Sequence, residues 1–367
     1  MKTQNRPSDI FYKMLSFIRF CSRQIAIIIY CLCSVNTIRK YIATDWTVLL
    51  DVSSPISCTI QGLVKLMSAL FYPKLYRKLT LDIGKIYEKY QEMGREYEEK
   101  LHTWNRSMKK LLIGCAIVYF VTGLLLLFTP VVMYVLKGER HLIWLCEVPG
   151  FERDSLYGYW VNNAFSVICV FIGCFGLYAG DVYLIIFLTH SMFFYDILAL
   201  KINDLHKLIE EDNHADRQTE LVNDIVEWHQ YYLDFNDKCN LLFFWTISAH
   251  IICTTAGILS TLLIIMLKDW PGAYSYLLVC FLWLYMYCIL GTRVEISNDQ
   301  FCTGIYDIHW YALDVHNQKT IRLMLTQSQA PRNITIAGIE PLSVNTALKI
   351  TRSIYSLAMM VLRFQTK

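Results

Sequence analysis

Residues 239–267 read CNLLFFWTISAHIICTTAGILSTLLIIML, and the segment 270–292, WPGAYSYLLVCFLWLYMYCILGT, follows after two residues. Neither segment contains a lysine, an arginine or an acidic residue, and His250 is their only histidine. A helix of about 20 apolar residues crosses a hydrocarbon core of about 30 Å and satisfies its own backbone polar groups there. Both segments are therefore predicted to cross a membrane as helices.

Five further segments complete the predicted set of spans. Two of them, 111–136 and 157–180, are also long and uncharged. The other three are weaker because charges interrupt them or their apolar run is short, and such helices are expected to pack inside protein or to face water. No linker, repeat or low-complexity tract divides the chain. We therefore predict a single all-α integral membrane domain over residues 1–367, with seven transmembrane helices at 20–38, 49–72, 111–136, 157–188, 239–267, 272–294 and 341–364.

The composition excludes several classes of function. The 367 residues are 55% hydrophobic and 18% charged, whereas soluble domains carry about 25% charged residues. A net charge of +3 without a polybasic arm gives no support for a nucleic-acid partner. The 13 cysteines form no motif of metal-ligand spacing, so no metal or cofactor is expected, and Cys146 stands alone in a predicted outer loop. No nucleophile elbow, Walker loop or HExxH motif indicates an enzyme.

The basic residues predict the orientation in the membrane. With a cytoplasmic N-terminus, the predicted inner segments hold 23 of the 34 lysine and arginine residues, and the outer segments hold 8. An excess of basic residues marks cytoplasmic loops. We therefore predict a cytoplasmic N-terminus and an extracellular C-terminus, which is opposite to the orientation of a G-protein-coupled receptor.

Amphipathic segments adjoin several spans on the predicted cytoplasmic side. Between the second and third spans, Leu79, Ile83, Ile86, Tyr90 and Met93 recur at spacings of three and four, as on one face of a helix. Two later segments show the same pattern, at residues 197–208 and 221–235. We expect the helices to extend into a packed cytoplasmic anchor layer where subunits meet; solvated loops are the alternative.

The C-terminal stretch 305–367 contains several spaced motifs, among them Tyr306 with Trp310, the segment 327–331, Pro341 with Ser343, and Ser353 with Tyr355. Together they resemble the C-terminal signature of insect odorant receptors. Segment 227–230, Glu-Trp-His-Gln, is similar to the family's segment before the fifth span, but more loosely. The order and spacing of many separate pieces make the C-terminal resemblance specific. The matching residues include Tyr306, Trp310, Gln327, Ser328, Gln329, Pro331, Pro341, Ser343, Ser353 and Tyr355.

The resemblance implies a seven-helix subunit of a tetrameric cation channel. In this family a variable tuning subunit assembles with an obligate co-receptor, in the plasma membrane of the olfactory neuron dendrite, and responds to a small volatile odorant. The loop between spans four and five, about residues 200–238, lacks the long insertion that is typical of the co-receptor. The chain therefore looks like a tuning subunit, with the co-receptor, an odorant and membrane lipid as its partners.

The resemblance also places the ligand among spans two, three, four and six, in the outer half of the membrane. A small volatile molecule suits a mostly apolar pocket with few polar contacts. Asp181 closes the uncharged run of span four, and a structural hydrogen bond is its expected role. The candidate ligand contacts are Ile56, Ile60, Leu124, Phe128, Ser166, Cys169, Val170, Phe281, Leu284 and Tyr285.

The last span is amphipathic, which is typical of a helix that lines a pore between subunits. By position relative to Tyr355, the resemblance places the outer gate on residues 358–362. We expect Ala358, Val361 and Leu362 to face the pore, because residues at i, i+3 and i+4 share a helix face. Packing against neighbouring helices is the alternative for this segment.

Lys349 and Arg352 lie one turn apart, toward the cytoplasmic end of the same span. If they face the conduction path, they disfavour divalent cations; pairing with acidic residues is the alternative.

A gustatory-type receptor channel is the nearest alternative for the whole chain, but the context of residues 327–331 favours the olfactory branch. A transporter is disfavoured because internal repeats and broken polar helices are not seen.

Overall fold

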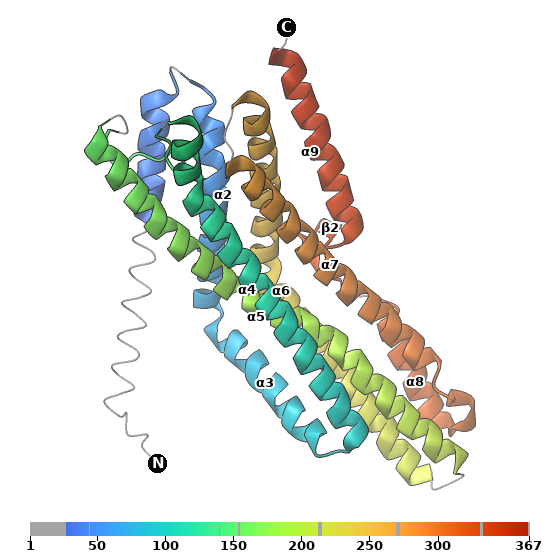
Figure 1. Ribbon diagram of the computed structural model, residues 1–367. Coiled ribbons are helices and arrows are strands. Elements are labelled where there is room, and N and C mark those ends of the chain that lie inside the picture. Colours follow the sequence, from blue (N-terminus) through green and yellow to red (C-terminus); the bar gives the residue numbers. More distant parts are fainter. Residues whose placement is uncertain are drawn as a thin grey trace, which may run out of the picture.

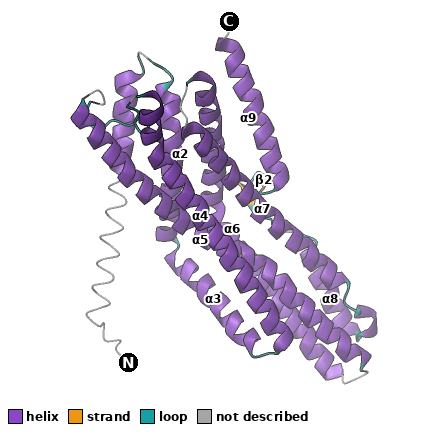
Figure 2. Cartoon of the chain, viewed as in Figure 1, coloured by secondary structure: helices purple, strands orange, loops and turns teal. Residues whose placement is uncertain are grey.

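The protein is almost entirely helical in its computed structural model, which describes residues 27–43, 45–138, 140–152, 155–211, 215–268, 272–330 and 333–365 (Figures 1 and 2). The beginning of the first predicted span lies outside these residues, and residues 27–41 are helical. The other elements are α2 (Val48–Phe71), α3 (Pro73–Gln91), α4 (Arg95–Lys137), α5 (Leu156–Glu210), α6 (Ala215–Leu267), α7 (Gly272–Tyr306), the 3-10 helix η1 (Trp310–Ala312), α8 (Val315–Ser328), β1 (Thr335–Ile336), β2 (Glu340–Pro341) and α9 (Val344–Gln365).

Helices α4 to α7 supply the strongest membrane spans. Within the described part of the chain, these four are long and apolar enough to cross a bilayer. Helix α5 has 55 residues and α6 has 53, so each is about 80 Å long and exceeds a hydrocarbon core of about 30 Å. Each therefore joins an apolar segment to an amphipathic segment in one continuous helix. The predicted class, an all-α membrane protein, is confirmed, and its orientation stays a prediction.

The amphipathic segments pack into a second layer, at the end of the molecule opposite to the C-terminus (Figure 1). In this anchor layer α3 buries four residues of the predicted apolar face, while Met93 follows the helix and is exposed. Lys201 of α5 is buried, bonds to Asp224 of α6 and lies over the rings of Tyr90 and Trp228. Burial lowers the pKa of Lys201 below its ordinary value, and the bond to Asp224 opposes this change.

A short hairpin turns the chain from α8 into α9. Strands β1 and β2 are antiparallel, and the turn between them places Ala337 and Gly338 at positive φ. The hairpin lies directly against α7, because a Cβ on Gly291 would be 2.0 Å from the carbonyl oxygen of Leu342. Helix α9 then packs against α6 and α7 through one face, which includes Ala347 and Ile354.

The signature residues of the C-terminal stretch build the connections around α8 and α9. Tyr306 ends α7 and Trp310 lies in η1, and both are exposed. Ser343 is buried, and its hydroxyl accepts a bond from the backbone N–H of Thr346 in the first turn of α9. Pro331 lies outside the described residues. Of the others, Gln327 and Ser328 end α8, Gln329 follows it, Pro341 ends β2, and Ser353 and Tyr355 lie on the exposed face of α9.

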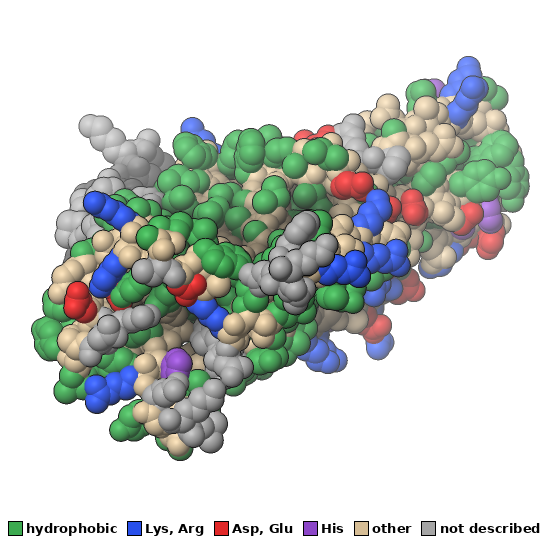
Figure 3. Space-filling view, turned by 90° about the horizontal axis from the view of Figure 1, so that it is seen from above, with side chains coloured by type: hydrophobic (Ala, Val, Ile, Leu, Met, Phe, Trp, Pro, Cys, Tyr) green, Lys and Arg blue, Asp and Glu red, His purple; other side chains and the backbone are tan. Residues whose placement is uncertain are grey.

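The outer surface is unusually apolar for a folded chain. Exposed apolar residues gather on the outward faces of α4 and α5, as in Ile117, Phe120, Phe128, Ile168 and Phe175. Viewed from the end where α9 finishes, hydrophobic side chains cover much of the visible surface (Figure 3). Such large exposed apolar patches mark membrane or protein contacts. The distribution agrees with helices surrounded by lipid.

Candidate functional site

A cavity of about 720 Å³ lies between the apolar parts of the helices. Its walls come from α2, α3, α4, α5, α6 and α7, and residues 27 and 30 of the N-terminal helix and Trp144 of the α4–α5 loop also line it. Small-molecule sites in proteins have volumes of about 300–1,000 Å³ and occur between helices of bundles. The cavity therefore has the size and the setting of a site for a small organic molecule.

Helix α5 gives the cavity an apolar wall built from small residues. Gly173 and Gly176 line it, and a Cβ at either position would meet no other atom within 4 Å. Gly180, also in the wall, has no such room, because a Cβ there would lie 2.7 Å from Cδ of Lys65. The glycines thus keep one part of the cavity open and let Lys65 approach α5 closely.

Lys65 and Asp181 form a buried ion pair beside the cavity. Their side chains are 3% and 0% exposed, and Lys65 Nζ lies 2.5 Å from Asp181 Oδ1. The hydroxyls of Tyr119 and Tyr287 also donate to this carboxylate. Because the four residues come from α2, α5, α4 and α7, they form a polar clasp between four helices. The clasp satisfies a charge pair that would be costly in an apolar bundle.

The expected hydrogen bond of Asp181 is present, and the carboxylate has an ion-pair partner as well. Its full burial places it inside the bundle. The three clasp residues other than Asp181 were not anticipated. Neither was their neighbour His250, whose ring stacks on Tyr287 with centroids 3.7 Å apart. The available signal was the pair of opposite charges, Lys65 and Asp181, within two apolar spans, because such charges pair with one another.

The structure brings two of the ten predicted ligand contacts to the cavity, Cys169 and Val170 of α5. Leu124 and Phe128 are 37% and 56% exposed on the outer side of α4, and Ile60 of α2 is 42% exposed. The cavity side of α4 instead carries residues 119, 122 and 126. The remaining predicted contacts are packed away from the cavity lining: Ile56 and Phe281 are half-buried, Tyr285 bonds to Thr351, Ser166 donates to the Asn162 carbonyl, and Leu284 is fully buried.

The predicted pore face of α9 is corrected by the packing. Ala358 is 0% exposed and belongs to the face that contacts the bundle, and Val361 and Leu362 are half-buried. The open face instead carries Lys349 and Arg352, together with the signature residues Ser353 and Tyr355. The reason is the helical phase: residue 358 lies four and eleven positions after the buried residues 354 and 347. Lys349 also contacts Glu340, at 3.4 Å.

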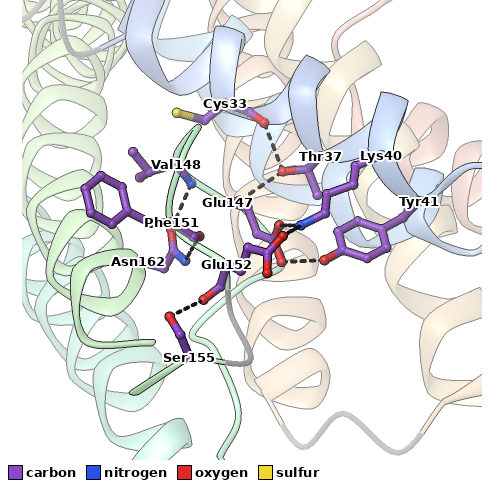
Figure 4. Close-up of polar contacts among 10 residues, drawn as sticks. All are labelled: Cys33, Thr37, Lys40, Tyr41, Glu147, Val148, Phe151, Glu152, Ser155 and Asn162. Carbon is purple, nitrogen blue, oxygen red and sulfur yellow. Dashed lines mark hydrogen bonds and ion pairs between the residues drawn. The ribbon is translucent and has the colours of Figure 1, made fainter. Parts of the chain in front are cut away.

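The α4–α5 loop, which contributes Trp144 to the cavity lining, is tied to the N-terminal helix by polar contacts (Figure 4). Glu147 is 2% exposed; its carboxylate accepts bonds from Tyr41 at 2.6 Å and Lys40 at 3.1 Å, and its backbone N–H donates to Thr37 at 2.9 Å. Cys146 is a free thiol, as expected for a lone cysteine in this loop, and it packs in a buried cluster with Tyr30 and Cys33. All cysteines among the described residues are free thiols.

Replacement of Glu147 by alanine is expected to loosen this loop. The change removes the carboxylate that accepts bonds from Tyr41 and Lys40, and a lost hydrogen bond of this kind costs about 1–3 kcal/mol. Hydrogen exchange of residues 140–152 should rise in the variant, while exchange in the anchor layer stays the same. Glu152 is exposed and 3.6 Å from Lys40, so Glu152→Ala is the control and should change little. Equal exchange in the two variants would show that the bonds of Glu147 do not hold the α4–α5 loop in place.

The ion pair between Lys40 and Glu147 is expected to persist throughout the physiological pH range. Hydrogen bonding to Glu147 raises the pKa of Lys40 above its ordinary value. A raised folded-state pKa means that the contribution to stability is fully present below the ordinary lysine value and is lost only as the pH rises through the folded-state value. Neutral and mildly acidic conditions therefore leave the ion pair formed.

Comparison with known proteins gives one consistent result. A family model described as 7tm Odorant receptor matches residues 45–355. The putative odorant receptor 83c of Drosophila melanogaster is 27% identical over 334 residues, which cover 87% of this chain and 83% of that protein. Odorant receptor 24a of the same species is 21% identical over 351 residues, covering 88% of this chain and 84% of that protein.

The solved structures agree on the fold. The insect olfactory receptor OR5 from Machilis hrabei, in complex with eugenol, matches with a TM-score of 0.79 and 14% sequence identity, covering 99% of this chain and 93% of that one. A second structure of the same receptor matches equally well, with a TM-score of 0.79. At this level of identity the match shows a shared fold.

Proposed function

The chain belongs to the 7tm odorant receptor family, and from this premise we propose that it is the odorant-binding subunit of a ligand-gated cation channel. The family is one of receptors and not of enzymes. The observation that carries the proposal is the cavity of about 720 Å³ that is lined by helices α2 to α7. A small, volatile and mainly apolar molecule would reach such a site and bury most of its surface there.

We place the channel between subunits, along the open face of α9. This face carries Lys349, Arg352 and Ser353, which are costly to expose to lipid but suit a water-filled path. The single chain leaves this face without a partner helix among its described residues. The proposed assembly is a tetramer with co-receptor subunits in the plasma membrane of an olfactory neuron, whose subunits meet in the anchor layer.

Co-expression with an odorant co-receptor tests this function. Currents should follow odorant application only when both subunits are present, with each subunit alone as the control. Odorant-evoked cyclic-nucleotide signals without a current would contradict the channel, and substrate uptake without a current would indicate a transporter. Current in the absence of the co-receptor would refute the mixed assembly.

The double replacement of Lys349 and Arg352 by glutamine is expected to raise the permeability to calcium relative to sodium. One charge about 10 Å from an ion in water contributes about 0.4 kcal/mol, and a divalent ion feels twice this repulsion. The permeability ratio should rise by about twofold for each charge removed, less after screening by salt. Reversal potentials under calcium–sodium gradients measure the ratio. Lys319→Gln, which removes an exposed lysine of α8, is the control, and an unchanged reversal potential in the double variant would place both residues away from the ion path.

A further inference from the structure

The cavity has two chemically different walls. Helix α5 contributes apolar and small side chains, such as Val170, Ile172 and Leu177. Helix α6 contributes Thr246, His250 and Thr254, and among the described residues these are its whole share of the lining. The three residues are spaced by four, so they lie along one face of α6. These three residues therefore form a polar stripe along the α6 side of the cavity.

Two members of the stripe lack side-chain partners. Thr246 is 3% exposed, and its hydroxyl has no hydrogen-bond partner among the described residues. His250 is 2% exposed, and neither ring nitrogen has a side-chain partner there. Thr254 differs, because its hydroxyl accepts a bond from the side-chain amide of Gln61 at 3.3 Å. Buried polar groups in native proteins are almost always hydrogen-bonded. The backbone of Trp283 interacts with His250, so the Thr246 hydroxyl and the other imidazole nitrogen require a partner from outside the described residues.

The charges nearby restrict the chemistry of that partner. Among the described residues, two cations line the cavity: Lys65, whose charge is balanced by Asp181 at 2.5 Å, and Arg77 of α3, which is exposed and lies outside the buried part beside His250. A carboxylate or an amine would add an unbalanced charge to a buried region, which is costly. A neutral imidazole presents one donor and one acceptor, and a threonine hydroxyl can do both. A neutral group that both donates and accepts, a hydroxyl, complements the two residues.

We propose that the ligand of this cavity is an apolar alcohol, whose hydroxyl bonds to Thr246 and His250 and whose hydrocarbon body lies against α5. The inference rests on the proposed function and specifies its ligand class. Ethers, aldehydes and ketones only accept hydrogen bonds, so they leave one wall group unpaired, and hydrocarbons leave both. Each missing bond reduces affinity by about tenfold.

The test uses the receptor co-expressed with a co-receptor and three hydrocarbon skeletons: linear, branched and monocyclic. Each skeleton is applied as its alcohol, its methyl ether and the parent hydrocarbon. For at least one skeleton the alcohol should act at a concentration about tenfold lower than the ether. Thr246→Val, which keeps the shape, and His250→Phe, which keeps the stacked ring, should each remove that advantage by weakening the alcohol alone. Thr255→Val is the control, because its hydroxyl bonds the Ile251 carbonyl on the same helix, outside the lining.

Two results would overturn the ligand class. One is an ether as potent as its alcohol for every skeleton. The other is that Thr246→Val and His250→Phe weaken the responses to alcohol and ether equally. Thermal stabilisation of the solubilised complex by each compound separates this failure from failure of the channel. Stabilisation by alcohols without current supports the ligand class and rejects the channel; currents without an advantage for alcohols reject the ligand class and support the channel. If the alcohols neither stabilise the complex nor evoke a current, both the ligand class and the channel are rejected.

Discussion

Asp181→Ala is expected to remove most of the receptor from the cell surface. The variant leaves the Lys65 ammonium buried without its counter-ion and removes the acceptor for Tyr119 and Tyr287. Breaking a buried ion pair by removing one partner costs about 3–5 kcal/mol, a large part of the about 5–15 kcal/mol that stabilises a typical protein. The four helices joined by the clasp would then pack less stably.

Replacement of both charged residues distinguishes an uncompensated charge from a general packing defect. In Lys65→Met/Asp181→Leu no charge remains, and such double apolar replacements of buried pairs are often neutral or even stabilising. We therefore expect the double variant to recover much of the surface level lost in Asp181→Ala, which is strong coupling between two residues in contact.

Surface biotinylation and the thermal unfolding of the solubilised complex measure this coupling. The exposed pair Arg95 and Glu99 provides the matched control, because both side chains are mostly in solvent and Glu99→Ala should change stability by less than about 1 kcal/mol. A double variant as unstable as Asp181→Ala would show that the uncompensated charge is not the reason for the loss. A normal surface level in Asp181→Ala would show that the clasp does not stabilise the fold.

Much of the helical architecture could be predicted from the sequence, because long uncharged runs and amphipathic spacings are local signals. The apolar face of α3 is an example: Leu79, Ile83, Ile86 and Tyr90 are buried as their spacing predicts. The expected extension of the helices beyond the apolar spans is present in α5 and α6, each of which joins an apolar segment to an amphipathic segment in one helix.

The rotation of each helix could not be predicted in the same way. Segment 111–136 contains no charged residue and only two threonines, which are a weak signal that Thr122 and Leu126 line the cavity while Leu124 and Phe128 face outward. In α9 the polar residues do mark a face. The small residue Ala358 suggested a gate, but a small side chain equally permits close packing, and here it is fully buried.

Gly173→Phe is expected to abolish responses to large odorants without affecting surface level. Gly173 lines the cavity and has open space where a side chain would begin, so the aromatic ring can occupy the ligand's volume without meeting the backbone. Glycine inside a helix is itself unfavourable by about 0.5–1 kcal/mol relative to alanine, so the helix should tolerate the change. A ligand forced to share the space loses about 1–3 kcal/mol, or about 5- to 150-fold in affinity.

The size series Gly173→Ala, Gly173→Leu and Gly173→Phe gives this prediction its sharpest form. If the cavity holds the ligand, sensitivity should fall stepwise with side-chain size and fall furthest for the largest odorants, because they need the whole volume. Gly114→Phe is the control: Gly114 is an exposed helical glycine of α4, it also has open space at its Cβ, and it lies outside the cavity lining. Equal losses at positions 114 and 173, or equal losses for small and large odorants, would mean that the ring perturbs the helix rather than filling a site, and the ligand would have to be sought elsewhere in the bundle.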